Sequence, residues 1–137
     1  MVKGRPGPFM CAAVFLVVLA ATAGLADEPL KCAECGMPVD VAAPFSSKIV
    51  GGDHTLYFCD IGDLLVYLRE RKTDPTYARV KDYRSGEWIE AAKAFYVHEP
   101  RRFMTPMGWG VASFKDKKDA EDFGVPSDIT AVSRRLK

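Results

Sequence analysis

The first clear pattern along the chain is a pair of apolar runs separated by a short polar turn. Residues 45–50 show mixed alternation of apolar and polar side chains, and residues 55–59 are rich in strand formers. Between them, Gly51 and Gly52 favour a tight turn. The pattern predicts a β-hairpin, with Cys59 at the end of its second strand.

The spacing of apolar positions changes directly after this hairpin. Apolar side chains now recur three or four residues apart, which predicts an α-helix over 61–72. Asp60 is placed to cap its first turn, and basic residues gather in its last turn, where they complement the helix dipole. The segment 73–75 ends in proline and stops the helix, and residues 77–83 alternate like a strand.

The second half of the chain shows a similar succession of short elements. We expect strands at 87–89, 94–98 and 111–114, a helix at 117–123 and a short strand at 129–132. Both halves then have a ββαβ pattern, although no residue-level repeat relates them. The sequence therefore predicts an α+β fold of two small ββαβ-type units, about 31–83 and 84–137.

The N-terminal segment has the layout of an export signal. Two basic residues precede an almost wholly apolar run over 9–19, and the small residues Gly24 and Ala26 suit a cleavage site after Ala26. An uncleaved segment would instead hold the protein at a membrane, but the run is shorter than the roughly 20 residues of a spanning helix. We expect 1–26 to be a signal peptide and 27–137 to be the exported domain.

Charge and motifs exclude several classes of function. The formal net charge of the chain is +1, so nothing points to nucleic acid as a partner. The sequence has no glycine-rich phosphate loop, nucleophile elbow or His-Glu-x-x-His motif, and we expect a protein that is not an enzyme. Three acidic residues, Asp53, Asp60 and Asp63, fit turn and cap roles.

Removal of the signal leaves an odd number of cysteines, Cys32, Cys35 and Cys59. Three thiols in an exported protein cannot all pair internally. The Cys-x-x-Cys pair is compatible with a thioredoxin-type redox centre, a zinc site, a copper site or a small disulfide. A redox centre of that type follows a core strand and opens a helix. Here no strand precedes the motif, and Gly36 and Pro38 interrupt a helix after it.

The two histidines differ in what their positions favour. A zinc site would need the three cysteines together with His54 or His98. His54 lies in the predicted hairpin turn, where a solvated side chain is the simpler interpretation. His98 ends a predicted strand a few residues before a methionine-containing loop, so it is a candidate copper ligand as a neutral imidazole. Cys59 is either a buried, inert thiol or a third sulfur of the site.

Three methionines stand beside proline and glycine rather than within a periodic apolar stripe. Met37 follows Cys35 by two residues, and Met104 and Met107 lie in a Met-x-Pro-Met-Gly segment. Filling gaps in a core is the alternative role for each of them. Because Cu(I) is a soft ion that prefers thiolate and thioether sulfur, these ligand types fit copper better than the other possibilities.

The motifs continue along nearly the whole mature chain. The Cys-x-x-Cys-Gly-Met-Pro-Val segment after the signal is followed by Leu56-Tyr57-Phe58-Cys59, Val80-Lys81-Asp82-Tyr83, Gly86-Glu87-Trp88-Ile89, Ala94-Phe95-Tyr96-Val97, Pro106-Met107-Gly108 and Asp119-Ala120-Glu121-Asp122-Phe123. This combination, over about residues 31–124, resembles the NosL family, the accessory proteins of nitrous oxide reductase. Many members carry a lipid-anchoring cysteine directly after the signal. This chain has none there, which favours an unanchored form.

The resemblance implies a periplasmic Cu(I)-binding metallochaperone with two ββαβ units, which supplies copper to nitrous oxide reductase or a similar copper enzyme. A membrane copper transporter or maturation complex is a further expected partner, and we expect the chain to be a monomer or weak dimer. An exported zinc-stabilised binding module and a thiol–disulfide oxidoreductase remain as alternatives. The copper ligands that the family implies are Cys35 and Met37 with Cys32, and Met107, while Met104, Cys59 and His98 are less direct candidates.

Overall fold

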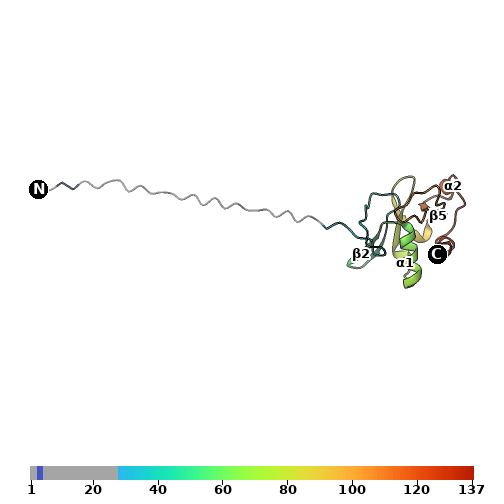
Figure 1. Ribbon diagram of the computed structural model, residues 1–137, viewed down its shortest axis with the longest axis horizontal. Helices are drawn as coiled ribbons and strands as arrows, with labels where there is room; N and C mark the ends of the chain where they lie inside the picture. Colours follow the sequence, from blue (N-terminus) through green and yellow to red (C-terminus); the bar gives the residue numbers. More distant parts are fainter. Residues whose placement is uncertain (1–2, 5–27) are drawn as a thin grey trace.

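The computed structural model describes residues 3–4 and 28–137 (Figure 1). The predicted signal peptide, apart from residues 3–4, and its cleavage site lie outside the described residues. In the described part of the chain, no helix is both long enough and apolar enough to cross a membrane. Short helices combine with antiparallel sheets, which confirms the predicted α+β class.

A four-stranded antiparallel sheet contains both strands of the predicted hairpin. Its strands lie in the spatial order β2-β1-β3-β4. The hairpin register pairs Ser47 with Phe58 and Gly51 with His54, so the tight turn lies where the two glycines predicted it. The bounds are β1 Ser47–Gly51, β2 His54–Phe58, β3 Ala78–Lys81 and β4 Trp88–Glu90.

Helix α1 (Ile61–Arg71) begins almost directly after β2 and confirms the predicted helix. The Asp60 side chain accepts a hydrogen bond from the Gly62 amide at 3.0 Å, as an N-cap residue does. A short 3₁₀ turn, η1 (Pro75–Tyr77), then leads into β3, which completes the predicted ββαβ order of the first half. Figure 1 shows α1 between the part of the chain that carries β2 and the part that carries β5 and α2.

The second half contributes a two-stranded antiparallel sheet of β5 (Phe95–His98) and β6 (Val111–Phe114). A 3₁₀ turn, η2 (Ala91–Lys93), precedes it and helix α2 (Lys117–Glu121) follows it. The two sheets meet where the Tyr83 amide donates to the Ser113 carbonyl at 2.8 Å. The predicted division of the chain at residue 83 falls between β3 and β4, which are neighbours in one sheet, and stays a prediction.

The predicted strand at 129–132 is wrong, because this segment is helix α3 (Ile129–Arg135). The Asp128 side chain caps it by accepting a hydrogen bond from the Ala131 amide at 2.7 Å. Ile129, Val132 and Leu136 pack into the core from one face of the helix. Their spacing of three and four residues is helical, and tertiary packing outweighs the strand preference of the β-branched side chains.

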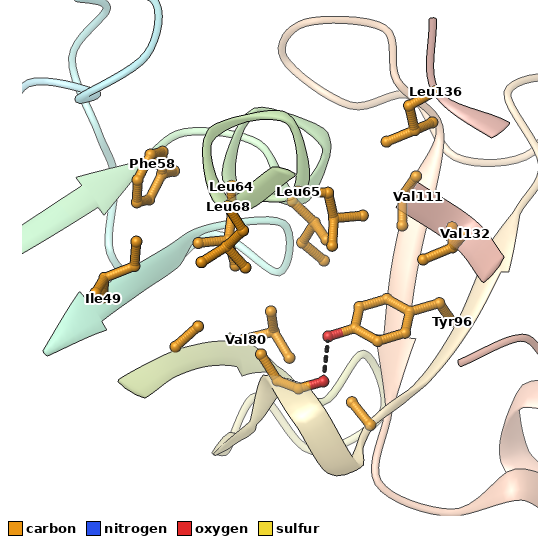
Figure 2. Packing of buried hydrophobic residues seen from close by; sticks show 14 of the residues in the cluster. Ile49, Phe58, Leu64, Leu65, Leu68, Val80, Tyr96, Val111, Val132 and Leu136 are labelled. Atoms are coloured by element: carbon orange, nitrogen blue, oxygen red, sulfur yellow. Dashed lines mark hydrogen bonds between the residues drawn. The ribbon is translucent and has the colours of Figure 1, made fainter. Parts of the chain in front are cut away.

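The main core joins the two halves of the chain (Figure 2). Leu64, Leu65 and Leu68 of α1 point toward Val80 of β3 and toward the side chains of the second half. The buried Tyr96 of β5 lies among them, and its hydroxyl donates to the Ala91 carbonyl at 2.6 Å. Burial raises the pKa of this phenol, so it stays a neutral donor. The core therefore fixes the start of α1 relative to both sheets.

The loop over 99–110 joins β5 to β6 and is fastened at its base. The Glu99 amide donates to the Gly110 carbonyl at 2.8 Å, and the Gly110 amide donates to the Thr105 hydroxyl at 3.1 Å. Gly110 has a φ of 65°, and a Cβ there would collide with Pro100. Phe103 is buried in a second, aromatic cluster with Tyr83, Phe114 and Phe123. The loop is therefore fastened at its base and at Phe103.

Asp82 joins the end of β3 to the end of β6, and its replacement should lower stability. It accepts hydrogen bonds from the Ser85 amide and hydroxyl at 2.9 and 2.7 Å, and from the Lys115 amide at 2.9 Å. Burial opposes its ionisation, but these bonds outweigh burial and hold the pKa of the carboxyl below its usual value of 3.8. Asp82→Asn should therefore lower the free energy of unfolding at neutral pH by about 1–3 kcal/mol.

The pH dependence of unfolding tests the same point. Because folding lowers the pKa of the Asp82 carboxyl, its ionised form stabilises the folded protein at pH values above the unfolded-state pKa. This stabilisation is lost as the pH falls through the folded-state pKa. Urea unfolding of the wild type should show this loss below about pH 3.8, and Asp82→Asn should show less of it. Asp53→Asn, in the exposed hairpin turn, is the control. Equal stability of Asp82→Asn and the control would contradict the prediction.

Candidate metal centre

The Cys-x-x-Cys segment forms a tight turn beside the edge strand β2. The Cys32 amide donates to the Met37 carbonyl at 2.8 Å, and the Gly36 amide donates to the Cys32 carbonyl at 2.9 Å. Gly36 has a φ of 76°, a conformation that glycine adopts without strain. The Ala33 amide donates to the Tyr57 carbonyl at 2.8 Å and ties the turn to β2. The motif is thus placed next to the strand that ends at Cys59.

A third thiol and a carboxyl group complete a cluster at this point. Cys59 follows β2 directly, and Asp63 lies in the first turn of α1. One donor atom from each of Cys32, Cys35, Cys59 and Asp63 lies within 4.8 Å of all the others. Sequence reasoning assigned Asp63 to a cap role and missed it. The four-residue spacing from Cys59 was the available signal.

Contacts inside the cluster are short and specific. The Sγ atoms of Cys35 and Cys59 are 3.4 Å apart. The thiols of Cys32 and Cys59 lie 3.3 and 3.5 Å from the same Asp63 oxygen, Oδ2. Cys32, Cys59 and Asp63 are buried, and Cys35 is partly exposed. A cation would therefore reach the buried sulfurs from the side of Cys35.

The three cysteines are free thiols. Burial raises the pKa of the Cys35 thiol and, much more strongly, that of the Cys59 thiol, and the neighbouring thiols and Asp63 add to the rise at Cys59. Both groups are therefore protonated near neutral pH when no metal is bound. A metal ion that binds them must displace these protons.

The predicted methionines all lie on the surface. Met37, Met107 and Met104 are 47%, 41% and 85% exposed. Met37 belongs to the cysteine turn itself, and the Met107 amide donates to Asp60 Oδ2 at 3.0 Å, which places its backbone beside the residue that follows Cys59. Met104 lies on the 99–110 loop. The structure thus places Met37 in the cysteine turn and the Met107 backbone beside Asp60, and their role as ligands stays a prediction.

Neither histidine joins the four-residue cluster. His98 ends β5, is partly exposed and pairs with Val111 in the second sheet. His54 opens β2 beside the hairpin turn and is exposed, as its position predicted. In the described residues, Asp63 therefore takes the fourth place that the zinc interpretation gave to a histidine, and a copper role for His98 stays a prediction.

Asp63 also connects the cluster to the loop that carries Met107. The indole Nε1 of Trp109 donates to Asp63 Oδ1 at 2.7 Å. The Trp109 ring lies so close to Gly62 that a Cβ there would overlap it. Neither contact follows from a motif in the sequence, because both depend on the placement of a loop nearly fifty residues downstream.

Two comparisons with known proteins gave a match for this chain. The sequence matches the NosL family over residues 26–126. The chain belongs to the NosL family. The crystal structure of the copper chaperone NosL from Shewanella denitrificans is similar, with a TM-score of 0.58 and 25% sequence identity. The similarity covers 72% of this chain and 85% of that one. A search of curated proteins gave no match.

The NosL match includes every residue of the cluster and the loop beside it. It begins just before the Cys-x-x-Cys turn and ends before α3. The resemblance drawn from the motifs is therefore confirmed. The α3 segment, which sequence reasoning misjudged, lies outside the family match, so the motifs gave no information about it.

Proposed function

We propose that this NosL chain is a copper-binding chaperone that carries Cu(I) as its cargo and is not an enzyme. One observation carries the proposal: three thiols from two separate segments converge within 4.8 Å, with one of them partly exposed. The similar Shewanella denitrificans structure, described as that of a copper chaperone, supports it. Sulfur ligands of this kind suit a soft, monovalent ion.

The arrangement also suits transfer of the ion to another protein. Cys35 is the most accessible of the three thiols, and the exposed Met37 lies two residues away. We infer that these two residues form the outer side of the site, with Met107 near it. A Cu(I) ion held by few ligands on an open side can pass to an acceptor by stepwise ligand exchange, without release into solution.

We further propose that the protein works in the periplasm and serves nitrous oxide reductase or a similar copper enzyme. The family membership and the signal-like N-terminal sequence support this proposal. A membrane copper transporter or maturation complex would be a second partner, and the carrier would act as a monomer or weak dimer. Co-purification of the copper-loaded chain with the acceptor enzyme, and copper gain by that enzyme, would test it.

Competition with a Cu(I) chelator tests the carrier function itself. The reduced protein should bind Cu(I) tightly. A Cys35→Ser, Met37→Ala double variant should bind Cu(I) more than about 100-fold more weakly. Changes to residues that only support the ligands already lower metal affinity by about 10–100-fold, and this variant removes proposed ligands themselves. Val125→Ala removes an exposed apolar side chain outside the cluster and serves as the control. Equal Cu(I) affinity of the double variant and the wild type would overturn the proposed site.

A zinc-stabilised binding module is the second candidate, and the number of donors in the cluster, four, favours it. Three thiolates and a carboxylate are sufficient for a closed tetrahedral zinc site. Metal analysis of protein purified without added metal separates the two functions. Stoichiometric zinc that resists chelators until the protein unfolds would favour zinc. Metal-free protein that takes up Cu(I) in the presence of excess zinc would favour the carrier.

A further inference from the structure

Asp63 is a buried carboxyl group that has no basic partner among the residues that the structure describes. The residue is 2% exposed, and the ion pairs found over residues 28–137 do not include it. A buried carboxyl group without a cation is costly unless hydrogen bonds satisfy it. Its donors are the Trp109 indole on Oδ1 and the thiols of Cys32 and Cys59 on Oδ2. The carboxyl therefore has the thiol cluster on one side and an indole on the other.

The indole belongs to a turn that is attached to the start of α1 at two points. The Met107 turn, residues 105–110, is closed by a bond from the Gly108 amide to the Thr105 carbonyl at 3.0 Å. The Met107 amide is bound to Asp60, and the Trp109 ring lies on Gly62. A shift of the Asp63 carboxyl thus acts directly on the turn that carries the exposed Met107.

We propose that Asp63 is a positioning residue that couples metal occupancy of the thiols to the Met107 turn through its hydrogen bond to Trp109. This inference rests on the proposed function. It gives the carrier a surface segment whose position differs between the empty and the loaded protein, so an acceptor enzyme can distinguish the two.

Metal binding changes the hydrogen bonds of Asp63 in a defined way. When Cys32 and Cys59 each form a sulfur–Cu(I) bond, their two S–H protons pass to solvent. Neither sulfur can then donate to Asp63 Oδ2, and both carry negative charge toward it. The Trp109 indole remains as the donor, and we expect its hydrogen bond to Oδ1 to shorten. The Met107 turn follows because Trp109 is part of it.

The indole N–H signals in a ¹H–¹⁵N spectrum test the proposal. The chain has two tryptophans, and the other, Trp88, lies on β4 with the Nζ atoms of Lys48 and Lys81 each 4.3 Å from its ring centroid. Cu(I) is diamagnetic, so the full, reduced chain can be titrated while both signals are observed. A Trp88→Phe variant assigns them. The Trp109 peak of the metal-free protein should lose intensity in proportion to bound Cu(I) while a new Trp109 peak grows at lower field, and the Trp88 peak should stay in place.

Asp63→Asn separates positioning from ligation. The amide oxygen can still accept from Trp109, but the amide nitrogen cannot accept from a thiol and carries no charge. The Trp109 shift on loading should then fall to the size of the Trp88 shift, while Cu(I) affinity should fall by no more than about tenfold, the lower end for an outer-shell residue. A loss of affinity as large as that of a cysteine variant would make Asp63 a ligand and overturn the positioning role.

The wild-type titration remains decisive if Asp63→Asn does not fold. A Trp109 signal that stays in place while a chelator assay shows stoichiometric Cu(I) binding would overturn the coupling and leave the carrier function intact. Absence of Cu(I) binding in that assay would overturn the carrier function, and the coupling with it.

Discussion

Replacement of Cys59 by serine should weaken Cu(I) binding more than about 100-fold, because loss of a ligand exceeds the roughly 10–100-fold cost of outer-shell changes. The Sγ atom of Cys59 lies 3.4 Å from the Sγ atom of the partly exposed Cys35. The thiols of Cys59 and Cys32 both donate to the same Asp63 oxygen. Serine keeps the size of the side chain and a hydrogen-bond donor for Asp63. It removes the soft sulfur atom, which is what Cu(I) requires.

Competition with a Cu(I) chelator measures this effect, and thermal unfolding of the metal-free variant controls for the fold. Cys32→Ser is the matched comparison, because that thiol is equally buried and also donates to Asp63. A Cys59→Ser variant that keeps wild-type affinity would show that Cys59 is an inert core thiol. The Cys-x-x-Cys turn and its methionine would then hold the ion without it.

Oxidation should abolish Cu(I) binding, and the disulfide should join Cys35 to Cys59 rather than the two cysteines of the Cys-x-x-Cys motif. The Sγ atoms of Cys35 and Cys59 are already 3.4 Å apart, and the Cys32 thiol donates to Asp63, as the Cys59 thiol also does. In exchange with a small disulfide such as oxidised glutathione, the two thiols lose two electrons and two protons, and the reagent is reduced to two thiols. The site then lacks two of its three sulfurs.

Peptide mapping by mass spectrometry identifies the linked cysteines, and a chelator assay on the same sample measures Cu(I) binding. A dithiol reductant should restore binding. Cys32→Ser should still form the link, and Cys59→Ser should not. A Cys32–Cys35 disulfide in the oxidised wild type would contradict this prediction, and oxidised protein that binds Cu(I) as tightly as reduced protein would exclude these thiolates as ligands.

Local signals in the sequence were enough to predict most of the fold. The paired glycines of the hairpin turn and the cap at Asp60 fixed β1, β2 and α1 within a residue or two. The strand predicted at 129–132 was wrong because Ile129, Thr130 and Val132 are β-branched and favour a strand locally. The helical spacing of Ile129, Val132 and Leu136 becomes informative only through packing of α3 against α1 and β5, which a local pattern does not contain.

The site was predictable in part of its sulfur atoms and not in its carboxyl group. The odd cysteine count and the soft ligand types favoured Cys32 and Cys35 as metal ligands, whereas Cys59 stayed open between an inert core thiol and a third sulfur of the site. Asp63 resembled an ordinary helix-start residue, and such residues commonly carry acidic side chains. Its contact with Trp109 requires a loop to fold back over α1, and spacing along the chain gives no information about such long-range placement.

The fastened 99–110 loop has a consequence for how this protein can change over evolution. The residues that hold the loop, Phe103, Thr105 and Gly110, differ from those that it exposes, Met104 and Met107. A mutation at an exposed position changes the surface of the loop and leaves in place the contacts that hold it. If the chain is the proposed carrier, substitutions at Met104 can change its specificity for an acceptor while the inherited fold and the buried thiols remain unchanged.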